Sequence, residues 1–303
     1  MVELARQIST TDYYKAALTK PNGFRTPDDL GPFADQLAQL AVQIHGQVAV
    51  TLDAPSGAGK SCTAQQLIHL VGLHHPEVSG VHVEGDRYLG TLRGTWQREA
   101  MTSGGPADFW QRIHDWQALT NFLGRVASLG VNGGIVPMGK TYEGDYFRYD
   151  RMSYIPQGPK VMVVTGLRLG DAVAEVYGQR NTIRTVLSVD PAIALMSSLV
   201  RDLSNGRITD LASFRERLEF RLKEYANQLP AFGALLSRTG EDKPVVFDYN
   251  TVHPPLANLK EVLLSQLAEW KNTKQPAENP DMLDLAEVIQ LVGTPEDPHA
   301  AAA

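Results

Sequence analysis

The feature that most constrains this chain is a glycine-rich segment, Ala54–Ser61, that directly follows a short apolar run. Its residues, Ala-Pro-Ser-Gly-Ala-Gly-Lys-Ser, match the pattern GxxxxGK[ST] except at the first position, where Ala54 stands in place of glycine. The preceding run, Val48–Leu52, is apolar and β-branched, which predicts a buried strand, and residues 61–72 have helical periodicity. A strand, a glycine-rich turn and a helix in this order predict a phosphate-binding loop.

This loop is suited to a nucleoside triphosphate and Mg²⁺. Gly57 and Gly59 tolerate positive φ, so the backbone amides of residues 57–61 can point inward at phosphate oxygens. The positive end of the following helix favours the same anion. We expect Lys60 to reach the β- and γ-phosphates of ATP and the Ser61 hydroxyl to bind Mg²⁺. The predicted nucleotide-binding residues of the loop are Ser56, Gly57, Ala58, Gly59, Lys60, Ser61 and Cys62.

Short apolar runs and helical segments alternate along the rest of the chain. Further strands are predicted at 81–83, 134–136, 160–164, 185–189 and 245–247, and helices at 29–45, 109–129, 191–203, 210–229, 257–270 and 282–291. This alternation favours an α/β fold, with a parallel sheet of the P-loop NTPase type and helices on both faces. We predict a helical extension over 1–45, a P-loop domain over 46–272, and a linker with a helical tail over 273–303.

Composition and charge exclude several classes of protein. The 303 residues carry a net charge of −6, from 28 Lys and Arg against 34 Asp and Glu, which argues against a dedicated nucleic-acid-binding protein. Cys62 is the single cysteine, so no intramolecular disulfide can form. No apolar run approaches the roughly 18 residues of a transmembrane helix, and residues 1–20 lack the pattern of a secretory signal. We therefore expect a cytoplasmic protein that does not bind membranes, with its state as a monomer or homo-oligomer left open.

Two acidic residues, Glu84 and Asp86, follow the second predicted strand. In a parallel sheet the carboxyl ends of the strands meet at the edge where ligands bind. A carboxylate at that edge can accept a proton from a reacting hydroxyl group. We favour Asp86 as this general base, because Gly85 lets the chain turn toward the loop, and Glu84 is the alternative.

These motifs together resemble those of the uridine kinase, phosphoribulokinase and pantothenate kinase group of P-loop kinases. The resemblance spans residues 46–255 and includes the loop, the acid–aromatic motif Glu84–Leu89, the segment Gly105–Phe109 before a helix, and the pairs Arg201-Asp202 and Gly206-Arg207. It implies Mg²⁺-dependent transfer of the γ-phosphoryl group of ATP to a hydroxyl group of a nucleoside, a sugar or sugar phosphate, or a vitamin precursor. It also implies that Arg201 and Arg207 belong to a lid that closes over the phosphates.

The resemblance also defines a predicted acceptor site and one departure. The acceptor contacts would be Asp86, Arg87, Tyr88, Arg93, Arg98, Lys140, Tyr142 and Arg148. Where the group ends a strand in Glu-Gly, this chain has Thr165-Gly166, so metal support would fall to Glu84, Asp86 or Asp53.

Two other functions remain open from the sequence. The arginines after Asp86 would suit the phosphate of a nucleoside monophosphate, which a nucleoside monophosphate kinase would phosphorylate. The absence of the family glutamate at Thr165 would also allow a regulatory protein that binds a nucleoside triphosphate without turning it over.

Overall fold

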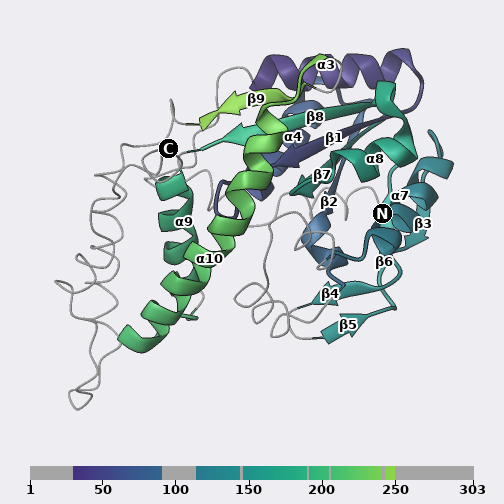
Figure 1. Cartoon of the computed structure of the whole chain (residues 1–303). Helices are drawn as coiled ribbons and strands as arrows, with labels where there is room; N and C mark the ends of the chain where they lie inside the picture. The colour runs from purple at the N-terminus through teal and green to yellow at the C-terminus, as the bar shows by residue number, and fades with distance from the viewer. Residues whose placement is uncertain are drawn as a thin grey trace.

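Figure 1 shows the computed structural model of the chain, which describes residues 30–90, 114–143, 146–189, 191–204, 206–240 and 243–249. Its centre is a five-stranded sheet in the order β2-β7-β1-β8-β9, with every neighbouring pair parallel. The strands are β1 Gln47–Asp53, β2 Ser79–Glu84, β7 Lys160–Gly166, β8 Thr182–Ser188 and β9 Val245–Asp248. Because the strands are parallel, their carboxyl ends meet at one edge, where the loop after β1 begins.

Alternating side chains on β1 explain why both faces of the sheet are covered. Val48, Val50 and Leu52 belong to one buried cluster, and Ala49 belongs to the other. A strand that is apolar on both sides must be covered twice. Helices α3 Leu30–Gln43 and α4 Lys60–His74 contribute to the first cluster, and α7 Trp116–Ser128 and α8 Gly170–Tyr177 contribute to the second. The predicted α/β fold with helices on both faces is confirmed.

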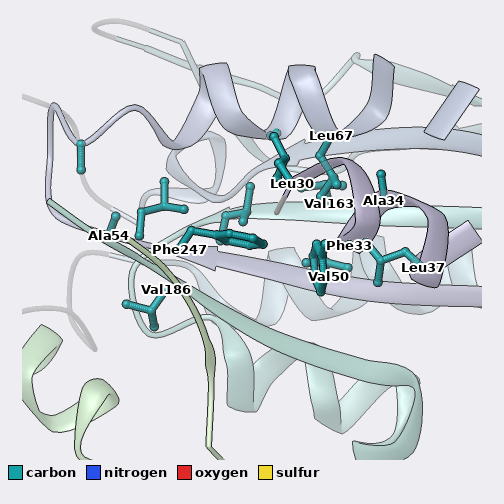
Figure 2. Packing of buried hydrophobic residues seen from close by; sticks show 14 of the residues in the cluster. Leu30, Phe33, Ala34, Leu37, Val50, Ala54, Leu67, Val163, Val186 and Phe247 are labelled. Atoms are coloured by element: carbon teal, nitrogen blue, oxygen red, sulfur yellow. The ribbon is translucent and has the colours of Figure 1, made fainter. Parts of the chain in front are cut away.

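Helix α3 is part of the main core. Figure 2 shows Leu30, Phe33 and Leu37 of α3 packed among the apolar side chains of the sheet. Phe33 meets Phe247 of β9 edge to face, with ring centroids 5.1 Å apart and an interplanar angle of 72°. Aromatic pairs of this geometry contribute about 0.5–1.5 kcal/mol beyond the area they bury. Residues 30–43 of the predicted N-terminal extension are therefore held by the sheet.

Two helices, α9 Pro191–Ser204 and α10 Leu211–Leu236, lie side by side (Figure 1). Helix α10 begins with a capping box, in which the Asp210 carboxylate accepts from the Ser213 amide and the Ser213 hydroxyl accepts from the Asp210 amide. We expected this helix to end at Leu229, before a proline, but it continues to Leu236. Its buried Phe232 and Leu235 join the core and offset the hydrogen bond that a proline removes.

Residues 134–155 form two short antiparallel ribbons. Strand β3 Gly134–Pro137 pairs with β6 Met152–Ile155, and β4 Thr141–Glu143 pairs with β5 Tyr146–Arg148. The strand predicted at 134–136 exists, but it lies outside the parallel sheet. Its burial alternates, with Ile135 exposed and Val136 buried. That pattern suits a ribbon with one face toward solvent, whereas the strands of a covered parallel sheet are buried on both faces.

Some predictions fall outside the described residues. The predicted helices at 257–270 and 282–291, the tail over 273–303, and residues 109–113 of the long predicted helix lie there. Helix α8 and the 3₁₀ turn η2 Gln179–Asn181 were not predicted from the sequence. In the part of the chain that the structure describes, no helix combines the length and the apolar character needed to cross a bilayer.

Candidate active site

The loop between β1 and α4 turns at its two glycines. Gly57 and Gly59 have φ angles of 78° and 86°, in the region that favours glycine. A Cβ atom at Gly57 would overlap the carbonyl oxygen of Ala194 on α9, so the approach of α9 also requires glycine there. Gly59 is the N-cap of α4 and no side chain caps this helix, which leaves its positive end for an anion.

Lys60, the first residue of α4, lies where four elements converge. Its Nζ donates hydrogen bonds to the carbonyl oxygens of Ala54 (2.7 Å) and Pro55 (3.0 Å). Burial lowers the pKa of Lys60, and nearby carboxylates, first among them Asp86 and Glu224, oppose that shift. The charge of Arg201 on α9 is also close enough to act on it. The loop lysine is thus surrounded by groups from β1, from the turn after β2, and from α9 and α10.

Asp53 ends β1 directly before the loop. It is 2% exposed, and its Oδ1 accepts a hydrogen bond from the Leu169 amide at 3.3 Å. Burial raises its pKa to about 6, although hydrogen bonds to its carboxylate oppose the rise. This carboxylate therefore gives up its proton at a higher pH than an exposed aspartate does, and its charge acts on the lysine of the loop.

The two predicted base candidates differ in their contacts. Glu84 is the last residue of β2, and Asp86 lies in the turn that follows, η1 Gly85–Tyr88. The Glu84 carboxylate accepts a hydrogen bond from the Arg87 guanidinium. Asp86 is exposed and has no hydrogen bond or ion pair with any described residue. A Cβ atom at Gly85 would lie 2.8 Å from the Thr165 carbonyl oxygen, so glycine is needed where the chain turns toward the loop. Of the two carboxylates, Asp86 is the one whose charge acts on Lys60.

The predicted acceptor residues occupy different environments. Tyr88 is fully buried and stacks on Phe122 with ring centroids 5.8 Å apart, so it belongs to the core rather than to a surface that could meet a ligand. Strand β4 contacts η1, which brings the β4–β5 ribbon beside Asp86. The side chain of Tyr142 and the residues Arg93 and Arg98 lie outside what the structure describes.

Lys140 and Arg148 flank the β4–β5 ribbon. Lys140 Nζ lies 3.3 Å from the Asp115 carboxylate and 4.2 Å from the centroid of the Phe147 ring. Arg148 Nε donates to the carboxylate of Asp150 at 3.1 Å. A hollow of about 260 Å³ lies beside Asp115 and Lys140. Both predicted cations are therefore held by neighbouring acids close to η1.

A larger groove of about 630 Å³ opens between the first turns of α7 and α8. It is lined by Trp116 and Thr120 on one side and by Arg168 and Glu175 on the other. Arg168 has a φ of 61°, a left-handed conformation that costs a non-glycine residue about 1–2 kcal/mol. The groove combines an aromatic ring with charges of both signs, near the edge where the strands end.

The two predicted lid arginines differ in their contacts. Arg201, in the last turn of α9, is exposed and acts electrostatically on Lys60. Arg207 is half-buried, and its guanidinium donates to Asp202 Oδ1 at 3.0 Å. Its backbone amide also donates to the Asp202 carbonyl oxygen at 2.9 Å. Arg207 is therefore paired with the buried Asp202, whereas Arg201 has no hydrogen bond or ion pair among the described residues and acts on Lys60 through its charge.

Few of the described side chains near the loop are suited to bind a metal ion. Thr165, where the resembling group has glutamate, is buried, and its hydroxyl lies 3.0 Å from His82 Nε2. Across the described ranges, no three His, Cys, Asp or Glu side chains are grouped so as to hold a metal ion. Mg²⁺ commonly keeps several waters and binds one or two protein groups together with nucleotide phosphates. The exposed Ser61 hydroxyl at the start of α4 fits such a role.

Sequence reasoning missed three polar residues of α10 that contact the loop or its partners. Ser56 Oγ donates to Glu224 Oε1 at 2.9 Å, and the Ser56 amide donates to Gln228 Oε1 at 2.8 Å. Arg221 donates to Glu224 Oε2 and to Asp202 Oδ2, both at 2.7 Å. A signal for them was present: apart from Phe220, the described buried residues of α10 recur at steps of three or four, and those in the middle of that stripe are polar. The stripe runs through Phe214, Leu218, Arg221, Glu224, Gln228, Phe232 and Leu235.

Comparison with known proteins gives structural likeness without a sequence match. No protein-family model matches the sequence, and no curated protein matches it. A possible uridine kinase from Bacillus stearothermophilus is 15% identical over 72% of this chain and 100% of its own, with a TM-score of 0.39. Phosphoribulokinase from Rhodobacter spheroides is 12% identical over 62% of this chain and 67% of its own, with a TM-score of 0.40.

A circularly permuted P-loop protein from Saccharomyces cerevisiae is 12% identical over 73% of this chain and 99% of its own, with a TM-score of 0.49. With TM-scores below 0.5 and identities of 12–15%, these matches support no conclusion about substrate or activity.

Proposed function

We propose that the protein transfers the γ-phosphoryl group of ATP to a hydroxyl group of a small molecule. The observation that carries this proposal is that Asp86 lies close enough to Lys60 for its charge to act on the lysine. Lys60 begins the helix after the glycine-rich loop, and Asp86 is an exposed carboxylate, without a hydrogen-bond partner in the described residues, whose charge acts on that lysine. A phosphate-binding cation beside an available base is the minimum that phosphoryl transfer to a hydroxyl requires.

In the proposed reaction the acceptor hydroxyl gives its proton to Asp86 as its oxygen forms a bond to the γ-phosphorus. The bond between that phosphorus and the oxygen bridging to the β-phosphate breaks, and ADP leaves. Lys60 and Arg201 offset the negative charge of the transferred group, because catalysis of this kind depends on positioning and electrostatics. Ser61 would hold Mg²⁺, which neutralises phosphate charge when bound.

The proposed acceptor lies on the η1 side of the loop. The β4–β5 ribbon with Lys140 and Arg148, and the groove lined by Trp116 and Arg168, both border that side. Their mixture of aromatic surface and charge suits a polar acceptor such as a nucleoside, a sugar, a sugar phosphate or a vitamin precursor. Of the residues predicted from the sequence for the acceptor, we retain Asp86, Arg87, Lys140 and Arg148.

The test is acceptor-dependent release of ADP. Thermal unfolding with Mg²⁺ and ATP, alone and with each compound of an acceptor panel, selects candidates, since a ligand at 100 times its Kd stabilises by about 2.7 kcal/mol. Each candidate is then incubated with Mg²⁺ and ATP, and ADP is measured over time. We expect one class of hydroxyl compound to raise ADP release well above the rate without acceptor.

The alternatives correspond to other results of the same assay. ADP release that needs nucleoside monophosphates would replace the proposal by a nucleoside monophosphate kinase. Nucleotide binding without ADP release for any acceptor would indicate the regulatory role. The absence of any nucleotide binding would contradict all three.

A further inference from the structure

We propose that α10 couples the phosphate-binding loop to the segment that carries Arg201 and Arg207, and that Glu224 and Gln228 are positioning residues for nucleotide binding. The proposal rests on the proposed function in one respect, namely that the loop binds ATP. Neither residue is predicted from the loop motif, because both lie far along the chain on another helix.

A continuous chain of hydrogen-bonded side chains joins the two regions. At one end, Arg207 donates to Asp202 Oδ1 at 3.0 Å, and Arg221 donates to Asp202 Oδ2 at 2.7 Å. At the other end, Arg221 donates to Glu224 Oε2 at 2.7 Å, and Glu224 Oε1 accepts from Ser56 Oγ at 2.9 Å. Each link is within ordinary hydrogen-bond length, and most are charge-assisted, which is the stronger kind.

Gln228 closes this chain at the loop. Its Oε1 accepts from the Ser56 amide at 2.8 Å, and its Nε2 donates to Glu224 Oε1 at 3.1 Å. The amide and the hydroxyl of Ser56 therefore both donate to α10. Residues 221, 224 and 228 lie on one side of the helix, because steps of three and four residues bring side chains to the same face.

Burial makes the chain behave as a unit. Asp202, Arg221, Glu224 and Gln228 are each no more than 3% exposed. Two buried carboxylates face the guanidinium of Arg221, and the half-exposed Arg207 supplies the second positive charge. Removing one member leaves another buried charge without its partner, which is strongly destabilising. A displacement of one member therefore disturbs its partners as well.

Helix α9 contacts the next residue of the loop. A Cβ atom at Gly57 would overlap both the Ala194 carbonyl oxygen and the Ser198 hydroxyl. The first half of the loop is thus held by α10 at Ser56 and by α9 at Gly57. Because Arg201 lies in α9 and Arg207 lies between α9 and α10, any displacement of these arginines toward bound phosphates acts on the loop through both helices.

Glu224 also acts on the loop lysine directly. Its charge is among those that oppose the effect of burial on the pKa of Lys60. A helix that only filled space could do so with apolar side chains, which often stabilise as well as a buried ion pair does. The polar centre of α10 instead supplies two things to the loop: hydrogen bonds that fix Ser56, and a carboxylate whose charge opposes the effect of burial on the pKa of Lys60.

The first experiment measures coupling by a double-mutant cycle. Isothermal titration with Mg²⁺ and a non-hydrolysable ATP analogue is applied to Ser56→Ala, Glu224→Ala and the double variant. We expect each single variant to bind the analogue about 10-fold more weakly and the double variant to be no weaker than the worse single one, since residues in one network are not additive. Glu216→Ala, an exposed site on the same helix, is the matched control and should bind as the wild type does.

The second experiment does not depend on nucleotide. Hydrogen exchange of the amides of residues 54–61 is compared in the nucleotide-free wild type, Asp202→Asn and Glu216→Ala. We expect Asp202→Asn, at the far end of the chain, to speed exchange in the loop by about 10-fold, since protection reports local opening. In the double-mutant cycle, Glu224→Gln replaces Glu224→Ala if the alanine variant does not fold, because glutamine keeps an oxygen for Ser56 and removes the charge.

The outcomes separate this proposal from the proposed function. Faster exchange in Asp202→Asn, in a protein that binds no nucleotide, would support the coupling and reject the function. Wild-type exchange and additive losses in the cycle, in a protein that binds the analogue, would reject the coupling and leave the function standing. An equal loss in Glu216→Ala would also overturn the coupling, because the effect would then not be specific to the network.

Discussion

The two halves of the candidate site are built differently. On the nucleotide side, the loop is bound to its surroundings: Lys60 donates to two backbone carbonyls, Ser56 donates twice to α10, and Gly57 packs against α9. On the acceptor side, Asp86 is exposed without a partner among the described residues, and Lys140 is half-buried and pairs with Asp115 at the start of α7.

This difference has a physical meaning. Phosphates carry the same charge and shape in every nucleotide, so a fixed set of donors can be prepared in advance, at no cost when the reaction occurs. An acceptor differs from one enzyme to the next, and its contacts come from segments that vary on a rigid scaffold. Under the proposed function, the buried network would serve the constant half of the reaction, and the exposed ribbons and groove would serve the half that selects the substrate.

Asp86→Asn gives the largest expected effect and tests the acceptor half. The asparagine keeps the shape of the side chain and removes its basicity, so acceptor-dependent ADP release should fall about 10²–10⁴-fold. Binding of ATP should remain near that of the wild type, because the loop is unchanged. Glu84→Gln is the matched control and should stay active. A dead Glu84→Gln with an active Asp86→Asn would move the base to Glu84.

Lys60→Ala tests the nucleotide half. Losing one preorganised positive group aimed at the transferred phosphate should lower turnover about 10²–10³-fold. Unlike Asp86→Asn, this variant should also bind the ATP analogue more weakly, since the charge contacts the nucleotide before and during transfer. The measurement is steady-state ADP release together with analogue titration. Turnover equal to that of the wild type would remove the basis for the proposed function.

Asp53 extends the comparison to pH, because the burial of this carboxylate in the nucleotide half makes the stability of the folded protein depend on pH. Burial raises its pKa in the folded protein to about 6, from the ordinary value of 3.8. Below pH 3.8, Asp53 is protonated in both the folded and the unfolded protein. Between pH 3.8 and about pH 6, it is protonated only in the folded protein. Stability therefore falls as pH rises through this window, by about 2–3 kcal/mol in total.

Asp53→Asn removes this loss. Denaturant unfolding of the variant and the wild type from pH 4 to pH 7.5 should show the variant gaining stability relative to the wild type as pH rises, with no further change above neutral pH. Asp210→Asn is the control: the hydrogen bond from the Ser213 amide lowers the pKa of Asp210 from its ordinary value of 3.8, so its linkage acts mainly below pH 4, and this variant should differ from the wild type by a nearly constant amount over most of this range. If the difference in free energy of unfolding between Asp53→Asn and the wild type did not change with pH, the pKa of Asp53 would not be raised in the folded protein.

Much of the fold could be predicted because its signals are local. The run before the loop and the periodic residues after it placed β1 and α4 within two residues of their observed ends at each boundary. The ribbons at 134–155 were harder, since strands of three or four residues with one exposed face carry little periodicity. Which strand pairs with which depends on packing across the chain, and not on any one segment.

The same distinction applies to the candidate site. The loop residues were identified because their motif is contiguous. Glu224 and Gln228 were not, because they reach Ser56 across 168 and 172 residues of sequence. The burial of Tyr88 was also missed: an aromatic residue beside an acid reads as a ligand contact, but Phe122 of α7 covers it. Long-range contacts of this kind follow only from the assembled fold.

Arg201 and Arg207 give the smallest expected effect, and they divide the two halves most finely. Both were predicted as lid residues, yet Arg207 is bound to the buried Asp202, whereas Arg201 is exposed and acts on Lys60. Arg201→Ala should therefore slow phosphoryl transfer about 10-fold, with unchanged thermal stability. Because Arg201 is exposed, raising the salt concentration should reduce the difference in transfer rate between this variant and the wild type.

Arg207→Ala should instead lower the thermal stability, since Asp202 loses one of its two guanidinium partners. The measurements are ADP release at two salt concentrations and thermal unfolding of both variants. Suppose instead that Arg207→Ala slowed transfer without loss of thermal stability, while Arg201→Ala changed neither property. The two roles would then be reversed, and Arg207, which is paired with Asp202 in the absence of nucleotide, would be the residue that contacts the phosphates.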